Sequence, residues 1–379
     1  MRFSIVALLI LTALVSQSTL GGPAAPTPAD ILGRMPQVDA FVRSEMQREK
    51  VPGVAIGIVS HGTVVASKGY GSANVELGVP VSEDTLFQSG SLGKQFTAVA
   101  VMLQVEEGKL GLDEPLTKYF PDAPRSWQAI TVRNLLNHTS GIPDYTDQPA
   151  GGAPPSIDLR RDYTEEELTK IAYGLPLEFT PGSQWKYSNT GYLVLGILIH
   201  KVSGNFYGDV LRDRVFVPLR MSTARIIDEA DIIPNRAAGY RLVNGELKNQ
   251  EWVAPMLNTT ADGALYLSMR DWIAWDKGLR AKAILKPESW AQVYTPVKLR
   301  NGSRYPYGFG WGVDESKGKP FLHHSGAWQG FETYIARYLA DDLTIIVLTN
   351  LADADPKQFA DGIVSMIDTD LLEKSSAAE

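Results

Sequence analysis

Ser91 and Lys94 are the residues whose types and spacing most directly predict chemistry. They bound the stretch Ser91-Leu-Gly-Lys94 and lie three residues apart, which places both side chains on one face at the start of a helix. The positive end of that helix favours a developing anion at the serine. Lys94 precedes a solidly apolar run, where desolvation lowers a lysine pKa and helps the amine act as a base. The alternative is that Ser91 is an ordinary N-cap.

The same Ser-x-x-Lys spacing occurs twice more, at Ser183/Lys186 and Ser316/Lys319. Ser and Lys are common, so the spacing alone is weak evidence. The later pairs lie in a Pro-Gly turn and in a charged loop, whereas the first opens a long apolar helix.

A second group of candidate residues lies in Trp185-Lys-Tyr-Ser-Asn-Thr-Gly191, before another apolar helix. The Tyr187 phenol can relay a proton, and the Asn189 amide can hydrogen-bond a substrate amide. The alternative is helix capping, since Ser188 and Asn189 both suit an N-cap.

A third group closes a predicted strand, in His323-His-Ser-Gly-Ala-Trp328. Gly326 carries no side chain, so a substrate backbone could approach it closely or pair with it as an added strand. The alternative is a plain strand-to-turn transition with a surface histidine.

Taken together and in this order, these motifs resemble the serine β-lactamase and penicillin-binding protein superfamily. The resemblance is strongest to the class C β-lactamase branch with its related D-peptidases and esterases, and it covers roughly residues 30–374. It is carried by five stretches, namely Phe87-Gln-Ser-Gly-Ser-Leu-Gly-Lys-Gln-Phe-Thr-Ala98, Leu135-Leu-Asn-His-Thr-Ser-Gly141, Pro181-Gly182, Tyr187-Ser-Asn189 and His324-Ser-Gly326.

The resemblance implies a role for each matching residue. Ser91 matches the nucleophile that forms an acyl-enzyme, and Lys94 matches the lysine beside it. Tyr187 matches the tyrosine that shuttles a proton to the leaving group, and Asn189 matches the residue that orients the substrate amide. Whether Lys94 or Tyr187 is the general base stays open at this point.

The third motif is implied to bind substrate through His324, Ser325 and Gly326, in the place of Lys-Thr-Gly. The backbone N–H groups of Ser91 and Ala327 match the oxyanion hole, whose donors are typically worth ~3 kcal/mol each. Dedicated class C β-lactamases carry lysine where this chain has His324. A mostly uncharged histidine grips a carboxylate less firmly, which favours a D-peptidase or an esterase.

We therefore expect a serine hydrolase acting through an acyl-enzyme on an amide or ester bond, as a D-peptidase or carboxypeptidase, an esterase or a weak β-lactamase. The alternatives are a dedicated class C-type β-lactamase and a penicillin-binding sensor that does not turn over. The expected partner is a small molecule or peptide, namely a β-lactam, a D-amino-acid peptide or an ester. We expect no cofactor, no metal and no nucleic acid.

The elements that must position these residues suggest an α+β fold of the β-lactamase-like type. Val54–Val59 and Thr63–Ser67 predict a hairpin around Ser60-His61-Gly62. Helices are predicted at Ser91–Glu107, Thr131–Leu136, Thr164–Tyr173, Tyr192–Val202, Arg270–Leu279 and Pro356–Leu372, and further strands at Tyr307–Val313, Phe321–Ser325, Thr333–Tyr338 and Leu343–Leu348. Strands at both ends predict one antiparallel sheet built from N- and C-terminal segments, flanked by helices, with a mainly helical lobe inserted.

Residues 1–20 are predicted to be a signal peptide, with a basic start, a short apolar run and small residues after it. Residues 21–30 form a Pro/Ala-rich lead-in, and residues 31–374 form the hydrolase domain. Within it, the α/β lobe takes about 31–90 and 290–374 and the helical lobe about 91–289. The chain is thus expected to be exported, to a periplasm or the outside medium, without a stable membrane span.

Composition excludes several other classes of protein. The chain has 379 residues, no cysteine and a formal charge of −7, which excludes thiol catalysis and thiolate metal sites and offers no cationic field for nucleic acid. No G-x-S-x-G pentapeptide supports an α/β-hydrolase, and no H-x-x-x-H pair supports a metallohydrolase. His138 is expected to serve a structural turn and Glu165–Glu167 a solvated helix start.

Overall fold

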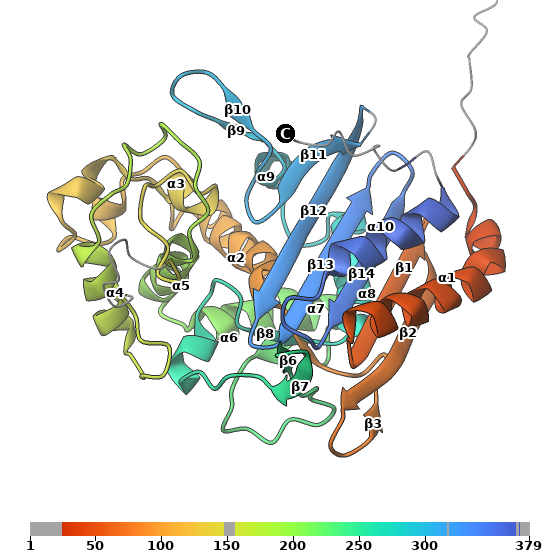
Figure 1. Ribbon diagram of the computed structural model, residues 1–379. Helices are drawn as coiled ribbons and strands as arrows, with labels where there is room; N and C mark the ends of the chain where they lie inside the picture. The colour runs from red at the N-terminus through yellow and green to blue at the C-terminus, as the bar shows by residue number, and fades with distance from the viewer. Residues whose placement is uncertain (1–24, 148–155, 317, 369–370, 372–379) are drawn as a thin grey trace, which may run out of the picture.

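The computed structural model describes residues 25–147, 156–316, 318–368 and 371. Its centre is a seven-stranded antiparallel sheet in the order β11-β12-β13-β14-β1-β2-β3, so strands from the two ends of the chain lie side by side, as expected (Figure 1). The strands of this sheet are β1 (Gly53–Ser60), β2 (Thr63–Asn74), β3 (Val79–Pro80), β11 (Gly312–Ser316), β12 (Lys319–Trp328), β13 (Phe331–Tyr338) and β14 (Leu343–Thr349).

The central pair β1 and β14 is buried on both faces, which explains its continuous apolar sequence. The β1–β2 hairpin is confirmed, and its turn uses positive φ at His61 and Gly62, as a tight two-residue hairpin requires. Asp342 likewise takes positive φ in the turn between β13 and β14.

Two terminal helices, α1 (Pro28–Glu49) and α10 (Pro356–Ile367), cover one face of the sheet (Figure 1). The prediction of a loose lead-in through residue 30 is wrong at its end. Thr27 and Asp30 form a capping box, and Pro28 occupies the first turn, so the helix starts at Pro28. The final helix ends at Ile367, earlier than predicted. The predicted signal and most of the lead-in lie outside the described residues.

The helical lobe packs against the other face through a large apolar core. Its helices are α2 (Lys94–Glu106), α3 (Val132–Leu136), α4 (Glu165–Gly174), α5 (Asn189–Ser203), α6 (Tyr207–Leu211), α7 (Val217–Leu219), α8 (Met269–Ala281) and α9 (Pro287–Val293), with short turns η1 (Gly90–Gly93), η2 (Leu116–Lys118), η3 (Arg125–Ala129), η5 (Arg212–Phe216) and η6 (Pro255–Thr259). Thr131 and Thr164 cap α3 and α4, and Gly204 ends α5 at positive φ.

Small strand pairs decorate this frame, namely β4 (Phe87–Gln88) with β8 (Leu265–Leu267) and β5 (Arg225–Ile226), β6 (Tyr240–Val243) with β7 (Glu246–Asn249), and β9 (Val297–Lys298) with β10 (Arg304–Tyr305). The predicted strand at Tyr307–Val313 is mostly wrong, because β11 begins at Gly312. Gly310 has φ of +71°, and a Cβ there would lie 2.8 Å from the Lys94 carbonyl carbon. The segment before β11 is therefore a turn pressed against the start of α2.

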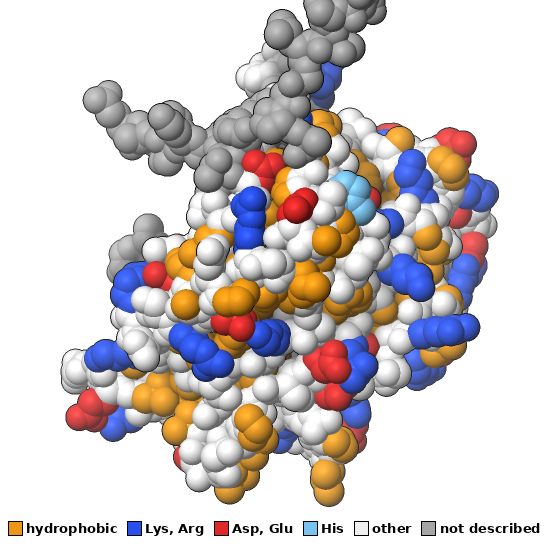
Figure 2. Space-filling model, turned by 90° about the vertical axis from the view of Figure 1, so that its right-hand side faces the viewer, with side chains coloured by type: hydrophobic (Ala, Val, Ile, Leu, Met, Phe, Trp, Pro, Cys, Tyr) orange, Lys and Arg blue, Asp and Glu red, His pale blue; other side chains and the backbone are white. Residues whose placement is uncertain are grey.

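Acidic and basic side chains are interspersed with apolar ones on the face that Figure 2 shows, the side on which α1 lies in Figure 1. That mixture agrees with the modest formal charge of the whole chain. None of the helices in the described ranges combines the length and apolarity needed to cross a bilayer.

Candidate active site

Ser91 lies in the 3-10 turn η1, directly before α2 begins at Lys94. It makes no capping hydrogen bond, and the N-cap of α2 is Gly93, so the interpretation of Ser91 as an ordinary N-cap is wrong. Ser91 is partly exposed and lines a cavity of about 310 Å³. The serine hydroxyl is thus accessible at the mouth of a buried helix.

Glycines let the turn that carries Ser91 pack directly on β12. Gly90 has φ of +50°, and a Cβ on it would lie 2.5 Å from the Ala327 nitrogen. A Cβ on Gly326 would lie 2.2 Å from the Ser89 carbonyl oxygen. The expectation that Gly326 leaves room for substrate needs correction, since its missing side chain makes room for Ser89. Ser91 and Ala327, the two predicted oxyanion donors, line the same cavity.

The last part of β12 has an open edge in the described chain. β11 pairs with β12 only as far as Gly312 opposite His323, while β13 pairs with β12 to Trp328 on the other side. Ser325 and Ala327 are exposed along this stretch, and Gly326 between them is buried. An extended substrate could therefore add to this edge next to Ser91.

Lys94 is fully buried, and its ammonium makes three hydrogen bonds. Nζ donates to Ser91 Oγ at 3.0 Å, to Asn189 Oδ1 at 2.6 Å and to the Asp262 carbonyl at 2.7 Å. The amide and peptide oxygens can only accept. When the amine is neutral, its two N–H groups are held by those oxygens, so its lone pair faces the Ser91 hydroxyl. The geometry therefore directs neutral Lys94 to take the serine proton.

The electrostatic surroundings of Lys94 make that neutral form accessible. Burial lowers the Lys94 pKa to about 8, and the carboxylates of Asp262 and Asp144 oppose part of the decrease. The pKa of a useful general base lies near the working pH. The desolvation that the apolar run predicts is thus present, and the two carboxylates that counteract its effect on the Lys94 pKa come from distant loops.

Tyr187 lies beside Lys94, whose Nζ is 4.8 Å from the centre of the phenol ring. Burial raises the Tyr187 pKa well above its ordinary value, and the nearby Ser91 hydroxyl offsets only part of that rise. The Tyr187 hydroxyl has no hydrogen-bond partner of standard geometry among the described residues. A protonated phenol without a committed partner suits proton donation better than proton abstraction.

Asn189 is the first residue of α5, and Ser188 caps that helix with its hydroxyl. The capping role falls to Ser188, which leaves the Asn189 side chain for the site. Asp144 Oδ2 accepts from both the Asn189 backbone nitrogen and Nδ2, each at 2.9 Å. This double contact fixes which end of the amide faces Lys94.

His324 is buried, and it is absent from the described residues that line the cavity beside Ser91. Its Nε2 lies 2.9 Å from the Tyr307 hydroxyl, and its Nδ1 lies 2.5 Å from the Ser325 carbonyl oxygen. Burial, with a smaller effect of Lys94, lowers the His324 pKa to about 3, so the ring is neutral. The prediction of an uncharged side chain agrees with this pKa. The side chain itself points to Tyr307, so direct contact between the imidazole and substrate is not supported.

His138 is more than a turn residue, although its φ of +59° and its carbonyl, which accepts from Lys186, do shape a turn. The ring is buried and lies 4.3 Å from the Tyr187 ring at a tilt of 34°. The Tyr187 ring therefore contacts both the Lys94 ammonium and the His138 imidazole.

Sequence reasoning missed Asp144, Asp262 and Tyr307. Asp262 is 168 residues from Lys94 and stands in a Thr-Ala-Asp-Gly loop with no spacing signal. Its Oδ2 accepts from the Tyr145 hydroxyl at 2.7 Å, while Oδ1 is buried without a partner in the described chain. Tyr307 was hidden in a segment predicted to be a strand.

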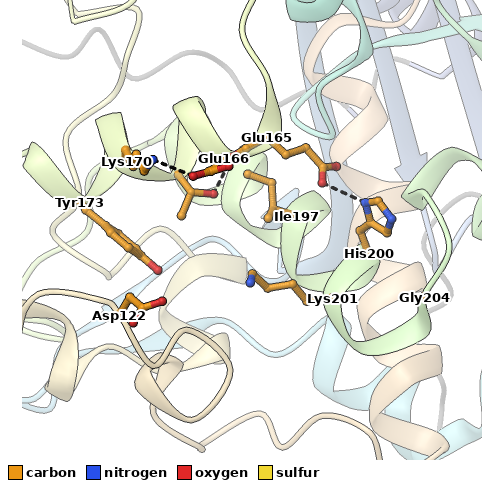
Figure 3. Close-up of a pocket in the computed structure, with 10 residues that line it drawn as sticks. Asp122, Glu165, Glu166, Lys170, Tyr173, Ile197, His200, Lys201 and Gly204 are labelled. Atoms are coloured by element: carbon orange, nitrogen blue, oxygen red, sulfur yellow. Dashed lines mark hydrogen bonds and ion pairs between the residues drawn. The ribbon is translucent and has the colours of Figure 1, made fainter.

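A larger cavity of about 580 Å³ lies away from this site, between α4 and α5 (Figure 3). Glu165 pairs there with His200 Nδ1 at 2.8 Å, and Glu166 pairs with Lys170 at 2.6 Å. None of the predicted site residues lines it. The acidic start of α4 is partly solvated, as expected, with Glu165 paired across to α5. In the described chain, no group of three or more acidic or histidine side chains is arranged to hold a metal ion.

Comparisons with known proteins agree with this geometry. The family model described as Beta-lactamase matches residues 38–364. Penicillin-binding protein 4* of Bacillus subtilis is 32% identical over 313 residues, which are 76% of this chain and 68% of that protein. D-aminopeptidase of Brucella ovis is 28% identical over 323 residues, which are 83% of this chain and 60% of that protein. The chain thus spans about three fifths of the D-aminopeptidase.

Among solved structures, the octameric penicillin-binding protein homologue from Pyrococcus abyssi aligns with a TM-score of 0.76 and 30% sequence identity. The alignment covers 88% of this chain and 77% of that chain. The similarity therefore extends over both the sheet and the helical lobe.

Proposed function

This chain belongs to the β-lactamase family, with its fold and its serine hydrolase chemistry, and from that premise we propose that it cleaves amide bonds of small substrates bearing a free amino group. The observation that carries the chemistry is the arrangement at Lys94, whose two fixed acceptors leave its lone pair for Ser91. The observation that carries the substrate class is the charge around the cavity.

The proposed reaction is a two-step acyl transfer. The Ser91 hydroxyl gives its proton to neutral Lys94 while Oγ bonds to the substrate carbonyl carbon. The resulting oxyanion is stabilised by the N–H groups of Ser91 and Ala327. The tetrahedral centre collapses, the carbon–nitrogen bond breaks, and the amine leaves with a proton from Tyr187, which Lys94 then restores. Water releases the acyl group by the same steps in reverse order.

The charges around the cavity favour an ammonium over a carboxylate in the substrate. Among the described residues that line it, none is Lys, Arg or His, and Asp262 is the one carboxylate. Asp144 adds a second negative charge close by, while His324 is neutral. With Lys94 neutral, as the reaction requires, an attached carboxylate meets two like charges. A β-lactam or a peptide with a C-terminal carboxylate therefore fits less well than an amino acid amide.

The similarity to a D-aminopeptidase supports the same choice of substrate. We propose D-amino acid amides and peptides with a free N-terminal D-residue as the first substrates to test, with short uncharged esters as a second class. Esters are included because they carry no charge that the site would oppose.

Export remains a proposal that the N-terminal sequence supports. Arg2, the apolar run after it and the small residues near position 20 form the pattern of a signal peptide. N-terminal sequencing of protein recovered from a periplasmic fraction or from the medium tests it. A mature protein that still begins at Met1 would contradict it.

The experiment that tests the activity is a rate panel on one purified protein. The substrates are a D-amino acid p-nitroanilide, its N-acetylated form, a D-Ala-D-Ala peptide, nitrocefin and p-nitrophenyl butyrate. We expect the free-amine anilide to exceed its N-acetylated form in kcat/KM at least tenfold, and Ser91→Ala to abolish both rates. Equal rates with and without the acetyl group would refute the amine preference, and wild-type ester hydrolysis by Ser91→Ala would refute the nucleophile.

The alternative of a sensor that acylates without turnover is separated by mass spectrometry after a penicillin pulse. A transient adduct, with steady release of product from the preferred substrate, supports a hydrolase. A persistent adduct of one acyl group on Ser91, with no turnover of any panel substrate, supports the sensor.

A further inference from the structure

A buried chain of hydrogen bonds joins the second and third motifs of the active site. The Ser188 backbone nitrogen donates to His138 Nδ1 at 3.1 Å, and His138 Nε2 lies 3.2 Å from the Tyr307 hydroxyl. The same hydroxyl lies 2.9 Å from His324 Nε2, and His324 Nδ1 lies 2.5 Å from the Ser325 carbonyl oxygen. Tyr307 is the central member of this chain.

Backbone groups at the two ends fix the direction of every bond in it. The Ser188 N–H can only donate, so His138 Nδ1 accepts, and the proton of this neutral ring must be on Nε2. The Ser325 carbonyl can only accept, so His324 carries its proton on Nδ1, and its Nε2 accepts. The Tyr307 hydroxyl then receives a hydrogen bond from His138 and donates one to His324. A hydroxyl does both, whereas a phenyl ring does neither.

Burial of this whole hydrogen-bond chain keeps its members in one arrangement. His138 and His324 are both buried, and burial lowers the pKa of each well below its ordinary value. Both rings are therefore neutral, as the bond directions require. Buried polar networks in which every member is satisfied hold their side chains in place.

The hydrogen-bond chain crosses between the two lobes that form the cleft. Ser188 and His138 belong to the helical lobe, and the His138 ring packs 4.3 Å from the Tyr187 ring. His324 and Ser325 belong to β12, at the open edge beside the nucleophile. The turn that carries Tyr307 is itself fixed, because Gly310 lies against the Lys94 backbone.

We propose that Tyr307 is a positioning residue that sets the distance between the Tyr187 phenol and the substrate-binding edge of β12 by linking His138 to His324. The inference rests on the proposed function, since it assigns a consequence for acyl transfer. Tyr307 does not touch the reacting atoms. Its hydroxyl acts through the two histidines, and small displacements of a catalytic group cost large factors in rate.

The test is Tyr307→Phe, which removes the hydroxyl and both of its hydrogen bonds while keeping the ring. With p-nitrophenyl butyrate we expect kcat to fall about 10- to 100-fold, with KM changing less than threefold, because the uncharged substrate binds in the cavity and Tyr307 does not line it. The matched control is Tyr334→Phe, another buried tyrosine, whose hydroxyl has no partner among the described residues. That control should keep the wild-type kcat.

A spectroscopic measurement tests the chain without any substrate. ¹⁵N NMR of the histidine rings in the wild-type protein should show His138 protonated at Nε2 and His324 at Nδ1, both with slowly exchanging ring protons. In Tyr307→Phe, the His324 Nε2 and His138 Nε2 signals should shift, while the other histidines stay unchanged. Circular dichroism and the thermal midpoint report whether the variant is folded.

The outcomes separate this inference from the proposed function. A folded Tyr307→Phe with wild-type kcat, or the opposite tautomers in the wild-type rings, would overturn the role of Tyr307. If the wild-type protein hydrolyses none of the panel substrates, the proposed function fails. The NMR result still decides whether the hydrogen-bond chain through Tyr307 exists. A loss of kcat together with the expected tautomers supports the inference.

Discussion

Replacing Asp262 by asparagine should shift the pH dependence of the enzyme in a direction that the geometry fixes. Asp262 and Asp144 raise the Lys94 pKa, while burial lowers it to the net value of about 8. Removing the Asp262 charge leaves burial less opposed, so the pKa of Lys94 should fall. Because the neutral amine takes the serine proton, the acidic limb of kcat/KM should move to lower pH.

The size of this effect follows from the wild-type value. With a pKa of about 8, only about one tenth of Lys94 is neutral at pH 7. A nearby opposite charge raises a lysine pKa by about one to three pH units. With the lower figure, Asp262→Asn leaves about half of Lys94 neutral at pH 7. The variant should then hydrolyse an uncharged ester about fivefold faster than wild type at pH 7, and equally fast well above pH 8.

The assay is kcat/KM for p-nitrophenyl butyrate between pH 5.5 and 9.5, corrected for spontaneous hydrolysis. An uncharged ester is chosen because Asp262→Asn should itself lower kcat/KM for substrates that carry an ammonium. Asp361→Asn on α10 is the control, since it removes one charge from the opposite face of the sheet. An acidic limb that stays in place or moves to higher pH in Asp262→Asn would refute the assignment of Lys94 as the titrating base.

Three further predictions concern packing, charge and stability. Gly326→Ala should reduce acylation more than 100-fold or lower the thermal midpoint by several degrees, because its Cβ would lie 2.2 Å from the Ser89 oxygen. The control Gly174→Ala, which has open space around its Cβ, should change neither the acylation rate nor the thermal midpoint. Unaltered kinetics and melting of Gly326→Ala would contradict this packing. His324→Lys should not lower KM for a cephalosporin, because the side chain at this position is buried, points to Tyr307 and does not line the cavity beside Ser91. A lower KM would show that a side chain at position 324 does reach the substrate. Wild-type protein should gain stability relative to Lys94→Met as the pH rises, because the folded pKa of Lys94, about 8, lies below the ordinary 10.5. Urea unfolding of both proteins should show a relative gain of about 3 kcal/mol for wild type between pH 8 and 10.5, and a pH-independent difference would argue against a lowered pKa.

The sequence by itself was sufficient for the local parts of the site. Ser91 and Lys94 are three residues apart, so a helix start brings them together whatever surrounds it. Tyr187 and Asn189 are only two residues apart in sequence, and the apolar periodicity identified the helices behind both motifs. The strand runs at the two ends of the chain also indicated a single sheet, which the structure confirms.

Only the tertiary structure decided the charges and hydrogen bonds that these groups meet. Asp262 reaches Lys94 from 168 residues away, and no spacing rule connects two loops so distant in the chain. Tyr307 could not be recognised either, because its turn forms only when Gly310 packs on the Lys94 backbone. Desolvation depends on every element that surrounds a group, and for that reason the pKa of Lys94 and the neutrality of His324 are properties of the folded protein.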